Sequence, residues 1–166
     1  MRFSCLSNSN CNLLPSLVKQ TSIIHELGDT CRLSTQFKIG DYLKTIDPNY
    51  TNPRYEVDFL LKVKSLTRDE YHNIIIEYDG LREHFTNLDE VDSSNFEYYL
   101  REEDVERQKV LESYGYHMIR VNKFNLGSDE VETIDSRIRK LIKQLENKVT
   151  NSFLDNLKKK SKIAED

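Results

Sequence analysis

The sequence lacks any long apolar run, and its beginning lacks the order of charged, apolar and small residues that marks a signal peptide. A membrane-spanning helix needs roughly 18 or more consecutive apolar residues, and no segment approaches that length. These two absences predict a soluble protein of the cytoplasm or another intracellular compartment. We therefore expect no membrane partner, while the oligomeric state is left open.

Cysteine is also scarce, since the chain has three, all before residue 32. An odd number gathered in one short stretch does not form the disulfide framework of a small secreted domain. Cys5, Cys11, His25 and Cys31 would supply four zinc ligands, but their spacing matches no compact zinc finger or ribbon. Inert thiols are therefore the favoured interpretation.

Glycine and proline are few, at 5 and 3 residues, whereas the chain has 9 Tyr and 7 Phe and is 37% hydrophobic. A chain of 166 residues with this composition can bury the core of one ordinary domain and is not globally disordered. Its net charge of −4 means that the whole surface does not attract a polyanion. Nucleic acid binding would need local basic patches or metal ions.

The first half of the chain predicts a helix followed by a β-hairpin. Residues 1–12 are polar and are expected to be frayed, and residues 13–27 are expected to form a helix that carries Glu26. Residues 47–54 have loop chemistry. Residues 55–63 and 73–79 read as two strands joined by a polar turn, which is typical of a hairpin.

The second half predicts a helix, a strand and a long amphipathic helix. Residues 101–115 have acidic residues in the first turn and end at Gly115, and residues 116–121 form a short strand. From Ser128 onward, apolar residues recur at helical spacing, and residues 158–162 are expected to be a solvated, frayed basic end. The fold class is therefore α/β, a small mixed sheet flanked by helices. Residues 1–127 would form the core, and residues 128–166 would pack on the same domain.

Several carboxylates occupy the expected hairpin. Side chains alternate along a strand, so Glu56 and Asp58 should share one face, and Glu77 and Asp79 should share a face of the second strand. Pairing of the strands would bring Asp58 and Glu77 together, where they repel unless they are protonated or bridged by a cation. Carboxylate oxygens suit Mg²⁺ or Mn²⁺, which can activate water against a phosphodiester. The alternative is that these acids are simply solvated at the strand ends.

The ordered series "VDFLL … IIIEYDG … H … EDVERQKVLESYGYHMIRVN" resembles the very-short-patch-repair-endonuclease-like branch of the PD-(D/E)XK nuclease superfamily. The resemblance covers roughly residues 53–126. It implies a restriction-endonuclease-like core, metal-dependent cleavage of DNA and an active site at the hairpin.

Positions carried over from the resemblance make Asp58 the central metal ligand, with Glu77 its partner and the carbonyl of Tyr78 a further ligand. Asp79 stands where the superfamily has a lysine, and here the sequence departs from the pattern. An aspartate cannot stabilise a phosphate as a lysine does, so Asp79 would bind metal, orient a water or be accessory. Two lysines near the end of the first strand are candidates for the missing cation: Lys62 and Lys64.

The resemblance also suggests roles outside the hairpin. His84 matches a loop histidine that acts on the water or the leaving group, and an imidazole with a pKa near neutrality suits that work. Glu26 resembles a helical acid of the superfamily. Asp104 and Arg107 share one helical face, so they form either a structural pair or a phosphate contact. Five basic residues are candidates for contacts with the DNA backbone: Arg82, Arg107, Lys109, Arg120 and Lys123.

The sequence therefore predicts a metal-dependent DNA endonuclease that uses Mg²⁺ or Mn²⁺. The alternative is a catalytically inactive nuclease-fold module that binds nucleic acid or a protein partner. A fragment of a larger helicase-nuclease or restriction protein would be compatible with either function.

Overall fold

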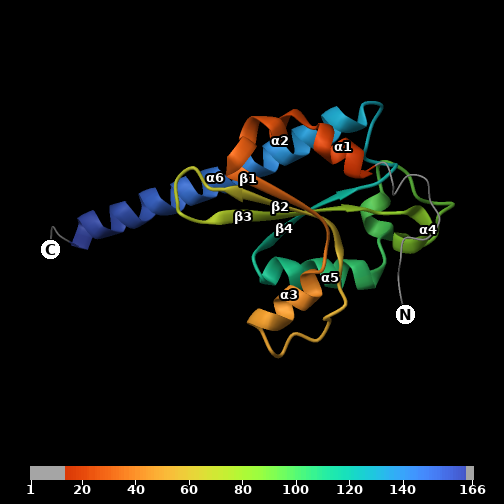
Figure 1. Ribbon diagram of the computed structural model, residues 1–166, viewed down its shortest axis with the longest axis horizontal. Coiled ribbons are helices and arrows are strands. Elements are labelled where there is room, and N and C mark those ends of the chain that lie inside the picture. The colour runs from red at the N-terminus through yellow and green to blue at the C-terminus, as the bar shows by residue number, and fades with distance from the viewer. Residues whose placement is uncertain (1–13, 164–166) are drawn as a thin grey trace.

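The computed structural model describes residues 14–163, and it has an α/β architecture built around one four-stranded mixed sheet (Figure 1). The expected frayed segment 1–12 lies outside the described residues. The strands are β1 (Cys31–Phe37), β2 (Val57–Lys64), β3 (Tyr71–Tyr78) and β4 (Tyr116–Val121), and their order in the sheet is β1-β2-β3-β4. The first three are antiparallel, whereas β4 runs parallel to β3. The predicted hairpin and the mixed sheet are thus confirmed.

Helices cover both faces of the sheet (Figure 1). One face carries α1 (Leu14–Gln20), α2 (Ser22–Leu27) and α6 (Glu130–Ile163), and the other carries α3 (Ile39–Ile46) and α5 (Glu102–Ser113). The connection from β3 to α5 contains the short helix α4 (Leu81–His84) and the 3-10 helix η2 (Phe96–Tyr99), and a 3-10 turn, η1 (Gly28–Thr30), precedes β1. Parallel strands need such a crossover, and α5 supplies it between β3 and β4.

The alternation of β2 and β3 divides the core into two clusters, one on each face. Phe59 and Ile76 pack with α1, α2 and α6, whereas Leu60 and Ile75 pack with Leu111 of α5. All five side chains are 1% exposed or less, as expected for strands covered on both faces. The odd-numbered side chains of β3, from Ile75 onward, therefore face α5.

The alternation predicted for residues 55–59 is wrong at its beginning. Tyr55 and Glu56 precede β2, so they are not part of its regular pleat. Val57 packs in the α5 cluster with Leu60 and not with Phe59. Regular alternation holds from Asp58 onward, next to Phe59, where the ladder between β2 and β3 begins opposite Ile76.

The helix predicted for residues 13–27 is interrupted at Thr21. The Thr21 backbone N–H and hydroxyl both donate to the Val18 carbonyl, at 3.3 and 2.8 Å, and end α1 there. Asp135 of α6 then accepts hydrogen bonds from the Ile23 backbone N–H at 2.7 Å and the Ser22 hydroxyl at 3.1 Å. A carboxylate at the first turn satisfies amide groups that would otherwise lack partners, so α2 begins against α6.

The C-terminal helix is amphipathic as predicted, but it is longer than expected. Ile134 and Ile138 are fully buried against the sheet and the N-terminal helices. The helix continues to Ile163, so the expectation of frayed backbone at residues 158–162 is wrong. Its C-terminal part extends beyond the sheet (Figure 1). None of the helices within residues 14–163 is both long and apolar enough to cross a membrane.

Candidate active site

The carboxylates of the hairpin lie on the α5 side of the sheet. Asp58 belongs to β2 and Glu77 to β3, and the register of Phe59 with Ile76 makes them neighbours on adjacent antiparallel strands. Asp79 follows β3, and its backbone N–H donates to the Val121 carbonyl at 2.8 Å, which continues the pairing with β4. The predicted convergence of the three acids on one face is therefore reproduced by the fold.

Asp58 is fixed by a backbone contact. Its Oδ2 accepts a hydrogen bond from the Tyr78 N–H at 2.9 Å. Burial raises the pKa of Asp58 above its ordinary value, although this hydrogen bond and the charges of Arg107 and His84 act in the opposite direction. Its second oxygen, Oδ1, accepts no hydrogen bond from the described residues. The predicted role of the Tyr78 carbonyl as a metal ligand stays a prediction.

Glu77 is bound by an arginine of α5. Its side chain is 10% exposed, and Oε1 accepts a hydrogen bond from Arg107 Nη2 at 2.8 Å. Burial raises the pKa of Glu77 to about 7, because Arg107 offsets the burial only in part and Asp58 adds repulsion. Arg107 also donates to the Glu56 carbonyl at 2.9 Å and lies over the Tyr55 ring, 4.9 Å from its centroid. The guanidinium is therefore held in one position.

Asp79 forms a two-pronged ion pair with Arg120 of β4. Arg120 Nε donates to Oδ2 at 2.8 Å and Nη2 donates to Oδ1 at 2.5 Å. The Asp79 side chain is 1% exposed, so burial raises its pKa even though Arg120 and His84 favour the charged form. Both carboxylate oxygens are occupied. In this arrangement Asp79 positions Arg120, and the metal-binding role expected for it stays a prediction.

His84 is oriented by Asp104 of α5. Nδ1 lies 3.0 Å from Asp104 Oδ2 and 3.8 Å from Asp79 Oδ1, and the ring is 19% exposed. Burial acts to lower the pKa of His84, but the hydrogen bond and charge of Asp104 together with the charge of Asp79 outweigh it and raise that pKa. Burial acts to raise the pKa of Asp104, yet the contacts with His84 and Arg120 outweigh burial and lower that pKa. The carboxylates of Asp104 and Asp79 therefore favour the protonated form of the histidine.

Two expectations for α5 need correction, and one is confirmed. Gly115 has φ of 83° and ends the helix in the left-handed region, as predicted. The acidic first turn is not wholly exposed, because Asp104 is buried against His84 and Arg120, whose Nη2 is 3.5 Å from Asp104 Oδ1. Asp104 and Arg107 do not pair with each other, since Arg107 is bound to Glu77.

The basic residues expected to contact DNA fall into two groups. Arg107 and Arg120 are bound to acids within the site, so in this structure they are not free surface cations. The other three are exposed: Arg82, Lys109 and Lys123.

The two lysines expected to replace the superfamily lysine are directed elsewhere. Lys62 lies over the Tyr42 ring at 5.7 Å from its centroid, and Lys64 pairs with Asp69 at 3.4 Å. Glu26 is on the opposite face of the sheet, where its carboxylate binds Arg139 at 2.7 and 2.8 Å. The cations beside the acids are instead the two arginines.

The metal implied by the resemblance has limited support in the donor set. Among residues 14–163, no group of three or more His, Cys, Asp and Glu side chains is placed to hold a metal ion. Asp58 Oδ1 and Glu77 Oε2, however, each accept no hydrogen bond from the described residues and come from adjacent strands. Mg²⁺ commonly uses one or two carboxylates and completes its shell with water and substrate phosphate. These two oxygens fit that requirement.

The high pKa of Glu77 predicts a dependence of stability on pH. A carboxyl group whose pKa rises to about 7 on folding, from 4.5, contributes stability that is complete below 4.5 and is lost as the pH rises through 7. We expect Glu77→Gln, which mimics the neutral acid, to gain stability over the native protein by up to about 3 kcal/mol as the pH increases over that window. Urea unfolding across that pH range measures the difference. Glu70→Gln, at an exposed glutamate, should show no such trend, and an equal trend in both variants would contradict the prediction.

The ion pairs of the site were not predicted from sequence, because each joins residues far apart in the chain. Asp79 and Arg120 are 41 positions apart, and Glu77 and Arg107 are 30 apart. Two signals pointed toward them: Arg107 shares a helical face with Asp104, and Arg120 alternates with Met118 along its strand. Neither signal identifies the partner.

Comparison with known proteins adds no assignment. No protein-family model matches the chain, and neither a curated protein nor a solved structure matches it.

Proposed function

We propose that the protein is a metal-dependent nuclease that hydrolyses phosphodiester bonds of DNA. The observation that carries the proposal is a set of three carboxylates, the buried Glu77 and Asp79 and the half-buried Asp58, gathered on one face of the sheet beside two arginines and a histidine. Perturbed titratable groups that cluster in this way are typical of catalytic sites. The resemblance in residues 53–126 supplies the reaction class, and the mixed sheet flanked by helices is compatible with its restriction-endonuclease-like core.

In this proposal Asp58 and Glu77 hold Mg²⁺ or Mn²⁺, since each has one carboxylate oxygen without a hydrogen bond to the described residues. The bound metal supplies Lewis-acid activation of water and of the phosphodiester. Glu77 must lose its proton before it can bind a cation, so metal affinity should increase as the pH rises through about 7. The surrounding burial keeps competing water away from the carboxylates.

Arg107 and Arg120 take the place of the missing superfamily lysine. Each guanidinium is held by a buried acid, Glu77 or Asp79, and therefore has its orientation set before substrate arrives. Preorganised cations stabilise the charge that grows on the phosphoryl oxygens without reorganising during the reaction. Asp79 then serves as a positioning residue for Arg120.

His84 is suited to proton transfer. Nδ1 is used by Asp104, so Nε2, which has no hydrogen-bond partner within the described part of the chain, is the nitrogen left for substrate. The neighbouring carboxylates raise the pKa of His84 and so favour the protonated ring, the form that can protonate the departing oxygen.

Cleavage of supercoiled plasmid and of single-stranded DNA tests the proposal directly. Purified protein is incubated with each DNA in Mg²⁺, in Mn²⁺ or in chelator, and nicked, linear and degraded products are separated. We expect products only with metal. Absence of products in every metal condition, with no rise in melting temperature on adding Mn²⁺, would refute a metal-dependent nuclease.

Removing the histidine gives a second test of the same site. We expect His84→Ala to lower the cleavage rate by roughly 10²- to 10⁴-fold, the usual contribution of a general acid or base. The matched control is His25→Ala, because His25 is an exposed histidine of α2 on the other face of the sheet. Cleavage is followed under single-turnover conditions. Equal rates for the two variants would remove His84 from the mechanism.

The alternative function is a module that binds nucleic acid or a partner protein without cleaving. It is favoured by the absence of a three-ligand metal group among residues 14–163 and by the ion pairs that hold Arg107 and Arg120 to acids of the protein. This alternative predicts that the protein retards DNA in a mobility-shift assay equally with and without metal, and that Asp58→Asn leaves the retardation unchanged. The proposed nuclease predicts that removal of metal and Asp58→Asn each change the result.

A further inference from the structure

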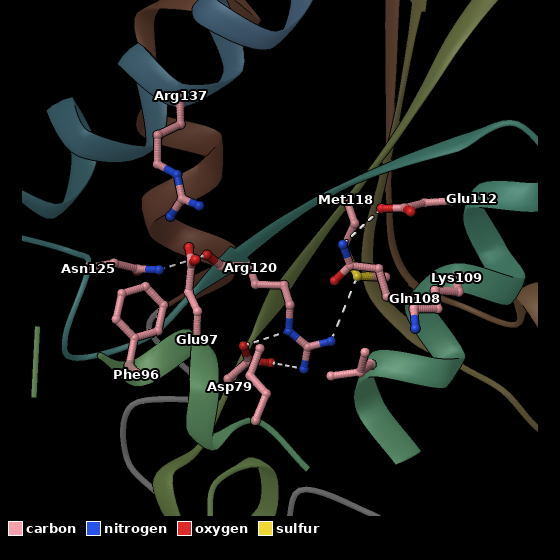
Figure 2. Close-up of a pocket in the computed structure, with 12 residues that line it drawn as sticks. Asp79, Phe96, Glu97, Gln108, Lys109, Glu112, Met118, Arg120, Asn125 and Arg137 are labelled. Atoms are coloured by element: carbon pink, nitrogen blue, oxygen red, sulfur yellow. Dashed lines mark hydrogen bonds and ion pairs between the residues drawn. The ribbon is translucent and has the colours of Figure 1, made fainter. Parts of the chain in front are cut away.

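A cavity of about 420 Å³ lies beside β4, the edge strand of the sheet, next to the Asp79–Arg120 ion pair (Figure 2). Its walls come from α5, β4, the 3-10 helix η2 and α6. The apolar part of the wall consists of Phe96, Leu100, Val105 and Met118. The volume falls within the range of small-molecule sites, which is roughly 300 to 1,000 Å³.

Arg137 of α6 reaches this cavity without a partner. It forms no hydrogen bond or ion pair with any residue of the described part of the chain, and its Nη1 is buried. Figure 2 shows its side chain extending from α6 toward Glu97, but the two are not within ion-pair distance. Arg137 is half-buried, but a guanidinium nitrogen buried without an acceptor is costly to the folded state, so Nη1 is suited to donate to an oxygen of a ligand in the cavity.

Arg120 presents a second unsatisfied donor to the same space. Its Nε and Nη2 are used by Asp79, whereas Nη1 has only the Met118 sulfur, at 3.8 Å. A thioether sulfur is a weak acceptor. Arg120 from β4 and Arg137 from α6 thus line the cavity, each with a nitrogen lacking an oxygen acceptor, and such groups favour an anionic ligand.

We propose that this cavity binds one nucleotide unit, with its phosphate at Arg137 and its nucleoside against Phe96 and the neighbouring apolar side chains. The cavity is larger than a phosphate ion needs, and its apolar wall would be left uncovered by phosphate alone. An aromatic ring such as Phe96 offers a stacking surface for any base. Gln108 and Asn125 also line the cavity, so amide groups are present near the nucleoside.

Three acids line the cavity, Asp79, Glu97 and Glu112, and Glu97 is the one toward which Arg137 extends (Figure 2). The charge of Glu97 together with that of Asp79 favours the protonated state of Arg137 against the burial that lowers the pKa of that guanidinium. Glu97 is exposed on η2, so its carboxylate can turn toward solvent when an anion enters. Neutralising Glu97 should therefore strengthen anion binding. If Arg137 had a purely structural role, this change would not strengthen anion binding.

The inference goes beyond the proposed hydrolysis, because binding in the cavity needs neither metal nor the Asp58–Glu77 pair. The nucleotide unit has two sources, a free mononucleotide or the 5′-phosphorylated end of a DNA strand. Both present the same phosphate and nucleoside to the cavity. The experiment separates them by using both as ligands.

The test is isothermal titration in chelator, so that its outcome is independent of cleavage. The ligands are thymidine 5′-monophosphate, inorganic phosphate, thymidine, and a short single-stranded oligonucleotide with or without a 5′-phosphate. We expect the monophosphate to bind more tightly than phosphate or thymidine. If the source is a strand end, the 5′-phosphorylated oligonucleotide should bind more tightly than the free monophosphate and than its unphosphorylated form.

Three variants make the test specific to the cavity. Arg137→Gln should weaken monophosphate binding at least about tenfold, the scale of one charged contact, and Glu97→Gln should strengthen it. Arg68→Gln is the matched control, because Arg68 lies in the β2–β3 turn and is 43% exposed. Circular dichroism checks that each variant is folded. Absence of monophosphate binding to the native protein, or equal binding by Arg137→Gln and Arg68→Gln, would overturn the proposal.

Discussion

Replacing Asp58 with Asn is expected to abolish metal-dependent DNA cleavage while leaving the protein folded. Asparagine keeps the side-chain volume and can still accept the hydrogen bond from the Tyr78 N–H, but it removes the charge that a divalent ion needs. Burial disfavours the charged form of Asp58, as its raised pKa indicates. The melting temperature without metal should therefore stay the same or rise. Cleavage assays and thermal melts with and without Mn²⁺ measure both effects.

The matched control for this variant is Asp69→Asn. Asp69 lies in the turn between β2 and β3, and its side chain is 96% exposed. The control should cleave DNA at the native rate and keep the native response to Mn²⁺. Cleavage by Asp58→Asn at the rate of this control would exclude Asp58 as the central ligand.

Replacing Arg120 with Met is expected to have the largest effect on stability. The change leaves the Asp79 carboxylate, which is 1% exposed, without its two-pronged partner. Removing one member of a buried ion pair typically costs about 3 to 5 kcal/mol, because the remaining charge is neither solvated nor paired. Urea unfolding measures the loss, and cleavage should disappear with it. Lys64→Met, which breaks the exposed pair with Asp69, should cost no more than about 1 kcal/mol.

A double variant distinguishes this explanation from a simple packing defect. Asp79→Asn together with Arg120→Met removes the orphaned charge, so the double variant should recover much of the stability lost by Arg120→Met alone. Such recovery is the coupling expected of residues in one ion pair. Equal stability of the single and double variants would mean that the loss comes from packing and not from the charge of Asp79.

The elements that sequence reasoning found are those with a strong local pattern. The apolar runs of β2 and β3, the helix stop at Gly115 and the helical spacing of α6 each specify their element without help from distant residues. Strand β1 and helix α3 were missed. Most side chains of β1 are exposed or only partly buried, so its strand state depends on the ladder that it forms with β2.

The candidate site likewise has a part that a local pattern predicts and a part that depends on distant residues. Alternation along two strands was enough to bring Asp58, Glu77 and Asp79 to one face, because it is a local property of extended chain. The roles of Arg107 and Arg120 depend on how α5 and β4 dock against β3, which no spacing within the chain encodes. Asp79 in place of a lysine therefore looked like a defect in the sequence, whereas in the structure it is the group that orients Arg120.

The parallel arrangement of β3 and β4 has a consequence for the time at which the site is complete during synthesis. Asp79 leaves the ribosome 41 residues before Arg120, the partner that binds both of its oxygens. Until α5 has crossed back and β4 has added to the edge of β3, the nascent chain holds its acids together without the cations that offset them. A chain that stops short of β4 thus carries the carboxylates but not the assembled centre, so any activity that depends on Arg120 begins only after β4 has been made.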